Sequence, residues 1–167
     1  MKRLILTAAL ALGAATATGV SVNAQEVVHV GPAASPIASV VVVPAGYETI
    51  YVSGMTPPAL DPKGDTAVAA TFGDTKTQTL GVLTKIQDAL KAQGADMGDV
   101  VMMRVLLVGD PAKGGKMDFP GMMESYKTFF GTAAQPNKPA RITSQVVSLV
   151  AGGMLVEIEV QAVKKVK

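Results

Sequence analysis

Three charged residues interrupt the apolar C-terminal part of the chain. Residues 139–163 are rich in valine, leucine and isoleucine, yet they include Arg141, Glu157 and Glu159. An arginine guanidinium can hold a small carboxylate through two parallel hydrogen bonds. A glutamate carboxylate can accept a proton from water. Charged side chains in an otherwise apolar strand pair are therefore candidates for a polar site that binds a ligand.

Side chains alternate between the two faces of a β-strand, and in residues 155–163 this alternation separates apolar from polar residues. One face is apolar and consists of Val156, Ile158, Val160 and Ala162. The other face is mixed and consists of Leu155, Glu157, Glu159, Gln161 and Val163. Arg141, Thr143, Gln145 and Val147 share a face by the same rule. We expect helices to cover the apolar face and the polar residues of both strands to share the other, which meets either solvent or a second subunit.

The distance between the two candidate catalytic groups argues for more than one subunit. If residues 151–153 form a turn between two antiparallel strands, Glu157 pairs near Val147 and Arg141 pairs near Ala162. Arg141 and Glu157 are then roughly 15 Å apart along the sheet. One chain could not bring both groups to one small ligand, so a shared site predicts a closed oligomer.

The rest of the chain predicts an α+β domain with its helices on a single face of one sheet. Apolar residues recur at helical spacing from Thr77 to Gly94, including Leu80, Leu83 and Ile86, and again within 122–131. Strands are expected at 27–30 and 99–108, and a hairpin at 38–43 and 49–53 around Pro44-Ala45-Gly46. The Pro- and Gly-rich residues 54–76 are expected to form a long loop.

The N-terminus has the pattern of an export signal. Lys2 and Arg3 precede an apolar run, and Val22-Asn23-Ala24 fits a signal-peptidase site. We expect cleavage after Ala24 and a single mature domain over 25–167, periplasmic or secreted and not held in a membrane. An uncleaved anchor is the alternative, but the apolar run is shorter than the roughly 20 residues of a membrane span.

Composition excludes several classes of site. The chain has 15 basic and 13 acidic residues, and residues 1–24 contain two basic and no acidic ones, so the mature chain has 13 of each. This balance gives no basic surface for nucleic acid. Cysteine is absent and His29 is the only histidine, so we expect no metal site and no cofactor. The nine methionines fit core packing better than copper binding.

Glu157 and Glu159 could also be considered as an acid and base pair for glycoside hydrolysis. They share one strand face at a spacing of roughly 7 Å. No aromatic residues that could stack on a sugar accompany them in the sequence. This interpretation is therefore the weakest of those considered.

Several stretches resemble the Rid family, the reactive intermediate (enamine/imine) deaminases, formerly known as YjgF proteins. The most specific are "PARITSQVVSL" at 139–149 and "GGMLVEIEVQAV" at 152–163, with "YVSGMTP" at 51–57 and "YKTFFG" at 126–131 in support. The likeness covers about residues 35 to 165. It implies a chorismate-mutase-like α+β fold and a homotrimer with three sites in the clefts between subunits.

The resemblance also implies roles for individual residues. Arg141 matches the arginine that holds the substrate carboxylate, and Glu157 matches the glutamate that orients a water for attack on the imine carbon. Thr143 lies two residues after the arginine. The family often has a cysteine at this position and uses its backbone groups in the site. Ser53 and Gly54 match residues that line the floor of the cleft. Glu159 matches an acidic position without an established chemical role, and we interpret it as structural.

Two positions depart from the family pattern. Ile37 lies where a tyrosine of the site is usual, and Met123 lies where an asparagine is common. Both substitutions make the expected cleft less polar, which favours a bulkier or more apolar substrate or lowers turnover. The resemblance thus implies hydrolysis of 2-imino or enamine acids to 2-oxo acids and ammonia. A trimer that binds small molecules or proteins without catalysis is the alternative.

Overall fold

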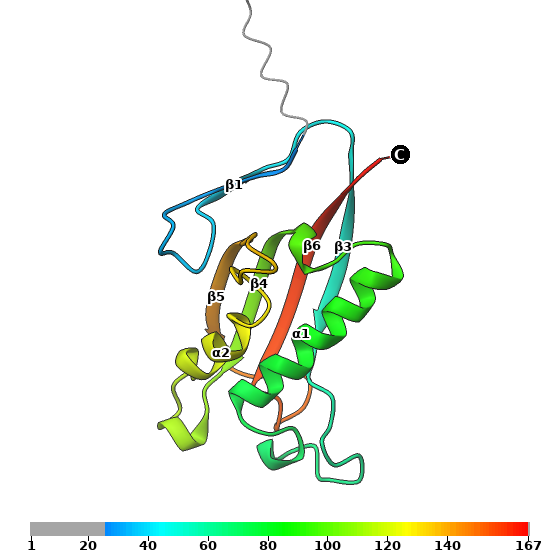
Figure 1. Cartoon of the computed structure of the whole chain (residues 1–167). Coiled ribbons are helices and arrows are strands. Elements are labelled where there is room, and N and C mark those ends of the chain that lie inside the picture. The colour runs from blue at the N-terminus through cyan, green and yellow to red at the C-terminus, as the bar shows by residue number, and fades with distance from the viewer. Residues whose placement is uncertain (1–25, 167) are drawn as a thin grey trace, which may run out of the picture.

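The computed structural model describes residues 26–166, and the signal peptide predicted for residues 1–24 lies outside this range (Figure 1). Among the described residues, no helix combines the length and hydropathy that a membrane span requires. The elements are β1 (Val28–Val30), β2 (Val40–Val42), β3 (Tyr47–Met55), α1 (Thr75–Ala92), β4 (Val100–Val108), α2 (Phe119–Tyr126), β5 (Ala140–Val146) and β6 (Val156–Lys165). Short 3-10 turns lie at 69–71, 97–99 and 111–113.

One four-stranded sheet with the order β3-β6-β4-β5 forms the body of the domain. Both helices lie on the same side of this sheet (Figure 1). The face of β6 that was expected to be apolar is buried there: Val156, Ile158, Val160 and Ala162 are at most 2% exposed. Met103, Val105 and Leu107 of the central strand β4 join the same core. The predicted α+β architecture with helices on one face is therefore confirmed.

The expected pairing of residues 139–149 with 155–163 as a hairpin is wrong. β5 pairs in parallel with β4 and occupies the edge of the sheet, while β4 lies between β5 and β6. Gly152 and Gly153 do not form a tight hairpin turn. They lie close to the backbone of residues 66–68. The Gly153 N–H donates to the Thr66 carbonyl at 2.9 Å, and a Cβ at Gly153 would clash with the Val68 carbonyl. Glycine was required here for packing between chain segments that lie far apart in sequence.

The expected hairpin of residues 38–43 with 49–53 is also wrong. β2 pairs with β1 in a separate two-stranded ribbon, and β3 pairs with β6. This ribbon is separate from the main sheet (Figure 1), and an isolated bridge between Ala38 and Ala140 connects its loop to the start of β5. His29 of β1 faces the body, where its Nδ1 lies 2.7 Å from the Lys138 carbonyl and donates a hydrogen bond to it. The nine-residue β3 satisfies one edge of the ten-residue β6 along almost its whole length, and β4 satisfies the other.

Helix α1 follows its sequence pattern with one exception. It begins two residues before the expected start, where the Asp74 side chain caps the Thr77 N–H at 2.8 Å. Leu83 and Ile86 are fully buried, but Leu80 is exposed. Gln78 is buried in its place on the inner face. Helix α2 begins before its expected start, after the cap Asp118, and ends at Tyr126.

The buried Gln78 fixes the entry to β6. Its amide nitrogen donates to the carbonyls of Gly73 and Gly153 at 2.9 and 3.0 Å, and its amide oxygen accepts from the Leu155 N–H at 2.7 Å. These three bonds satisfy backbone groups that would otherwise be buried without partners. Glu157 follows Leu155 by two residues, so the Gln78 amide also helps to fix the backbone position of Glu157.

We expect Gln78→Leu to lower the free energy of unfolding by about 3 kcal/mol, because it leaves three backbone groups without partners. Urea denaturation followed by circular dichroism measures this. Gln87→Leu on the same helix removes one exposed bond to Asp96 and should change stability by less than about 1 kcal/mol. Equal losses for the two variants would contradict the role assigned to Gln78.

Candidate active site

Arg141 and Glu157 lie on opposite faces of the sheet within one chain. Both strands pair with β4, where Arg141 is level with Met103 and Glu157 is level with Leu106. Paired residues share a face, and positions 103 and 106 of one strand point to opposite faces. The two residues are also separated by three positions, about 10 Å, along β4. The expected shared polar face is therefore wrong, because Arg141 lies on the helix side and Glu157 on the open side.

The guanidinium of Arg141 is enclosed by apolar and aromatic side chains of α2. Its carbon lies 4.3 Å from the centre of the Tyr126 ring and 5.8 Å from that of Phe119. One terminal nitrogen donates to the Met123 sulfur at 3.2 Å, which is a weak acceptor. Burial lowers the pKa of Arg141, and the nearby Tyr126 opposes this effect. Among residues 26–166, no carboxylate forms an ion pair with Arg141.

A half-buried cation without a carboxylate partner is unusual in a folded domain. Buried charges are normally paired, because removal from water is otherwise strongly unfavourable. Stacking on Tyr126 and Phe119 offsets part of this penalty. The N–H groups that remain form a planar set of donors suited to a carboxylate. The geometry therefore favours an anionic ligand at Arg141.

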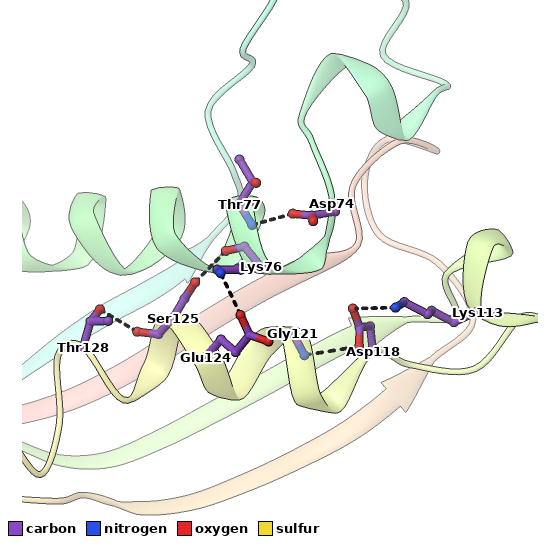
Figure 2. A network of polar contacts seen from close by, with 9 residues as sticks. All are labelled: Asp74, Lys76, Thr77, Lys113, Asp118, Gly121, Glu124, Ser125 and Thr128. Atoms are coloured by element: carbon purple, nitrogen blue, oxygen red, sulfur yellow. Dashed lines mark hydrogen bonds and ion pairs between the residues drawn. The ribbon is translucent and has the colours of Figure 1, made fainter.

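Polar contacts with α1 and at its own N-terminus hold helix α2 over the sheet. Figure 2 shows the contacts that dock it against α1: Lys76 pairs with Glu124 at 2.7 Å, and the Ser125 hydroxyl donates to the Lys76 carbonyl at 2.7 Å. At the start of α2, Asp118 caps the Gly121 N–H at 3.2 Å and lies 3.8 Å from the Lys113 ammonium group. The helix is short, so these end contacts decide where its inner face lies.

Tyr126 joins the arginine to the N-terminal segment. Its hydroxyl donates to the Pro36 carbonyl at 3.1 Å, and its ring stacks on Phe130. The Ala38 N–H donates to the Pro139 carbonyl at 3.0 Å, so residues 36–38 run beside the start of β5. Ile37 is part of this segment and packs against the edge of the core. The predicted site residues Ile37, Met123 and Arg141 thus come from neighbouring segments.

Thr143 follows Arg141 on the same face of β5, level with Val105. Its hydroxyl oxygen is buried and has no hydrogen-bond partner among the described residues. Gln145, the next residue on this face, accepts from the Met117 N–H at 2.9 Å and donates to the Gly115 carbonyl at 3.1 Å. On this face of β5, the Gln145 amide has hydrogen-bond partners among the described residues, whereas the Thr143 hydroxyl has none.

Glu157 lies over a bulge in β3. The pairing of β3 with β6 shifts between Val52 and Met55, which places Ser53 and Gly54 in the irregular part. A Cβ on Gly54 would clash with the Glu157 carboxylate, so a glycine at this position makes room for it. Ser53 and Gly54 lie in this irregular part of β3 beside Glu157, on the opposite side of the sheet from the group around Arg141.

Glu159 is engaged elsewhere on the open face. It forms an ion pair with Arg104, which is level with it on β4. This contact fits the structural role that was expected for Glu159. It also leaves Glu157 as the acidic residue of this strand that pairs with no cation among residues 26–166.

Phe119 and Tyr126 were not predicted as site residues. Tyr126 lies within the helix expected at 122–131, and Phe119 lies before its expected start. A signal was available, because positions 119, 123 and 126 have the i, i+4, i+7 spacing that puts side chains on one helical face. It could not be used without knowing that this face covers Arg141.

The phenol of Tyr126 should make stability depend on pH in the alkaline range. Burial raises its pKa to about 12 from the ordinary value of 10.0, although the Arg141 charge opposes this. Between about pH 10 and pH 12 the unfolded chain loses this proton while the folded chain keeps it, so stability falls as the pH rises. We expect Tyr126→Phe to remove about 2 kcal/mol of this decline, as measured by urea unfolding across the range. Parallel curves for both proteins would contradict the assignment.

Comparisons with known proteins agree with this fold. The endoribonuclease L-PSP family model matches residues 32–164. A 2-iminobutanoate/2-iminopropanoate deaminase from Capra hircus is 36% identical over 70% of this chain and 73% of its own length. A RutC family protein from Sulfurisphaera tokodaii is 32% identical over 67% of this chain and 77% of its own length. A structure of a Rid family protein from Yersinia pestis superposes with a TM-score of 0.60 at 21% identity, covering 81% of this chain and 97% of that one. The chain therefore belongs to the endoribonuclease L-PSP family, also known as the YjgF or Rid family.

Proposed function

We propose that this protein hydrolyses 2-imino acids and their enamine tautomers to 2-oxo acids and ammonia. The observation that carries the proposal is the half-buried guanidinium of Arg141, which faces aromatic rings and a thioether and has no carboxylate partner among residues 26–166. A substrate carboxylate supplies that partner. Relatives named as 2-iminobutanoate/2-iminopropanoate deaminases at 36% identity support the same activity.

The chemistry requires few groups. Arg141 holds the carboxylate, and Glu157 accepts a proton from a water molecule as its oxygen attacks C2 of the imine. Glu157 passes this proton to the imine nitrogen, which gives a carbinolamine. The same carboxylate then transfers the hydroxyl proton of the carbinolamine to its amine, and the C–N bond breaks to release ammonia and the 2-oxo acid. The imine carbon is already electrophilic, so the reaction does not depend on a metal ion or a covalent nucleophile. Thr143, Ser53 and Gly54 are proposed to contact the substrate or the water.

Arg141 and Glu157 of one chain lie on opposite faces of the sheet, so a site that contains both groups must take them from two chains. We propose a homotrimer in which Arg141, on the edge strand β5, meets Glu157 of the next subunit. The open face supports such an interface, because it exposes the apolar side chains Tyr51 and Ile142 beside the Arg104–Glu159 ion pair. Uncovered apolar surface of this kind is typical of subunit contacts.

A trimer that binds ligands without turnover is the second candidate. Ile37 and Met123 favour it, because they replace two polar side chains usual in the family and leave an apolar surround at Arg141. Ligand binding that needs Arg141, together with no turnover and no effect of Glu157→Gln, would support it. The family description names RNA cleavage, but the balanced charge of the mature chain and the single histidine give no support for that reaction here.

We expect Arg141→Ala to lower kcat/KM for 2-iminopropanoate about 100-fold, because it removes the charged hydrogen bonds to the carboxylate. Glu157→Gln should lower kcat by about 100-fold or more, because it removes the base. A flavin amino-acid oxidase generates the imine, and ammonia release above the uncatalysed rate is followed. Glu48→Gln, which breaks the ion pair between Glu48 of β3 and Lys164 near the end of β6, is the matched control and should retain activity.

Co-expression of the two inactive variants with different tags tests whether the site is shared. In every trimer that carries both tags, one of the three clefts joins an intact Arg141 to an intact Glu157, so about one third of wild-type activity should return. If both groups of a site belonged to one chain, no cleft would be intact and no activity would return. A monomeric mature protein would also contradict the proposal.

We also propose that the mature protein is exported. The basic start, apolar run and Val22-Asn23-Ala24 of the sequence support this. Expression of the full chain in an export-competent bacterium, followed by fractionation and N-terminal sequencing, should find a periplasmic protein that begins at Gln25. A cytoplasmic protein that keeps residues 1–24 would contradict the proposal.

A further inference from the structure

We propose that Phe119 and Met123 form an apolar wall beside Arg141 that receives the substituent on C2 of the substrate, so that the preferred substrates are 2-imino acids with bulky apolar side chains. This inference rests on the proposed function, and it names the substrate class within that function. It is carried by the placement of the two side chains around the guanidinium.

Phe119 is partly exposed although it lies next to a half-buried cation. The residue is 39% exposed, and the centre of its ring lies 5.8 Å from the guanidinium carbon of Arg141. Tyr126, by contrast, is 1% exposed and covers the guanidinium at 4.3 Å. One aromatic ring is thus used to support the arginine, and the other still presents surface to a ligand.

The distances suit a substituent on C2. A carboxylate held through two hydrogen bonds of about 2.8 Å places its carbon about 4 Å from the guanidinium carbon, and C2 is one bond farther. C2 and the centre of the Phe119 ring then lie at similar distances from the guanidinium carbon, so a substituent on C2 that turns toward the ring can reach it. Contact between a branched or aromatic substituent and this ring would remove apolar surface of both from water.

Met123 adds a wall that can adapt its shape. Its sulfur lies 3.2 Å from a terminal nitrogen of Arg141, and the side chain is 8% exposed. Methionine has an unbranched, polarisable side chain that fits irregular apolar shapes. An amide at this position would instead present polar atoms that a hydrocarbon substituent could not satisfy. The wall should therefore accept leucine-, methionine- and phenylalanine-derived imines at similar rates.

The test compares 2-imino-4-methylpentanoate with 2-iminopropanoate in the full-length mature protein. We expect kcat/KM to be about tenfold higher for the larger imine. Phe119→Ala and Met123→Asn should each reduce this ratio several-fold. Leu80→Ala removes an exposed apolar side chain from the outer face of α1 and should leave the ratio unchanged. A wild-type preference for 2-iminopropanoate, or variants that keep the wild-type ratio, would overturn the proposal.

Calorimetric binding of the stable products separates this inference from the proposed reaction. We expect 4-methyl-2-oxopentanoate to bind about tenfold more tightly than pyruvate, and Phe119→Ala to remove most of this difference. If the binding preference is found without any turnover, the apolar wall is supported and the deaminase function is overturned. If turnover is found with equal binding of both products, the wall is overturned and the function stands.

Discussion

The position of the Arg141 guanidinium under helix α2 is the constraint on which the candidate site depends. A cation that is removed from water needs an anion, and among residues 26–166 no carboxylate pairs with it. The chain instead stacks it on Tyr126 and places the Met123 sulfur at one of its nitrogens. These contacts hold the guanidinium N–H groups in place. An anion that pairs with them would have to come from a ligand or from residues other than 26–166. Docking of α2 on α1 through Lys76, Glu124 and Ser125 maintains this arrangement (Figure 2).

The alternation of side chains across the sheet is the second constraint. β4 is paired on both sides, and its register fixes Arg141 on the covered face and Glu157 on the open one. No rotamer can bring a side chain through a hydrogen-bonded sheet, so the two groups cannot meet at one small ligand within a chain. The sheet that carries the core of one subunit therefore separates Arg141 from Glu157. The proposed site needs both residues, so it can form only between subunits. Gly54 and the bulge at Ser53 give the carboxylate of Glu157 its room on the open face.

The apolar side chains around Arg141 bear on which carboxylate ligands the candidate site would select. A guanidinium next to rings and a thioether still binds a carboxylate strongly, because the local environment is less polar than water. Selection among carboxylates then depends on the atoms beside the carboxylate. The fold is shared across the family, whereas recognition depends on the side chains around the candidate site, here including those at positions 37 and 123.

Sequence alone determined the elements whose signal is local. The period of two in residues 156–162 predicted a buried face that the structure confirms, and the helical spacing around Leu83 and Ile86 predicted α1. The candidate residues Arg141 and Glu157 stood out because charge is rare inside apolar strands. Leu80 was assigned wrongly, because its hydropathy suggested burial, while Gln78 lies inside to satisfy backbone groups from distant loops.

Only the tertiary structure decided which strands pair and what surrounds the arginine. The Gly-Gly pair after β5 has the pattern of a hairpin turn, but it is needed where residues 152–153 approach residues 66–68, a contact that no local pattern predicts. Strand order β3-β6-β4-β5 in turn decided that the two charged residues face opposite ways. Phe119 and Tyr126 belong to the candidate site because α2 places both rings against Arg141 of β5. Pairing and helix docking join residues far apart in the chain, so their free energies depend on the whole fold and not on neighbouring residues.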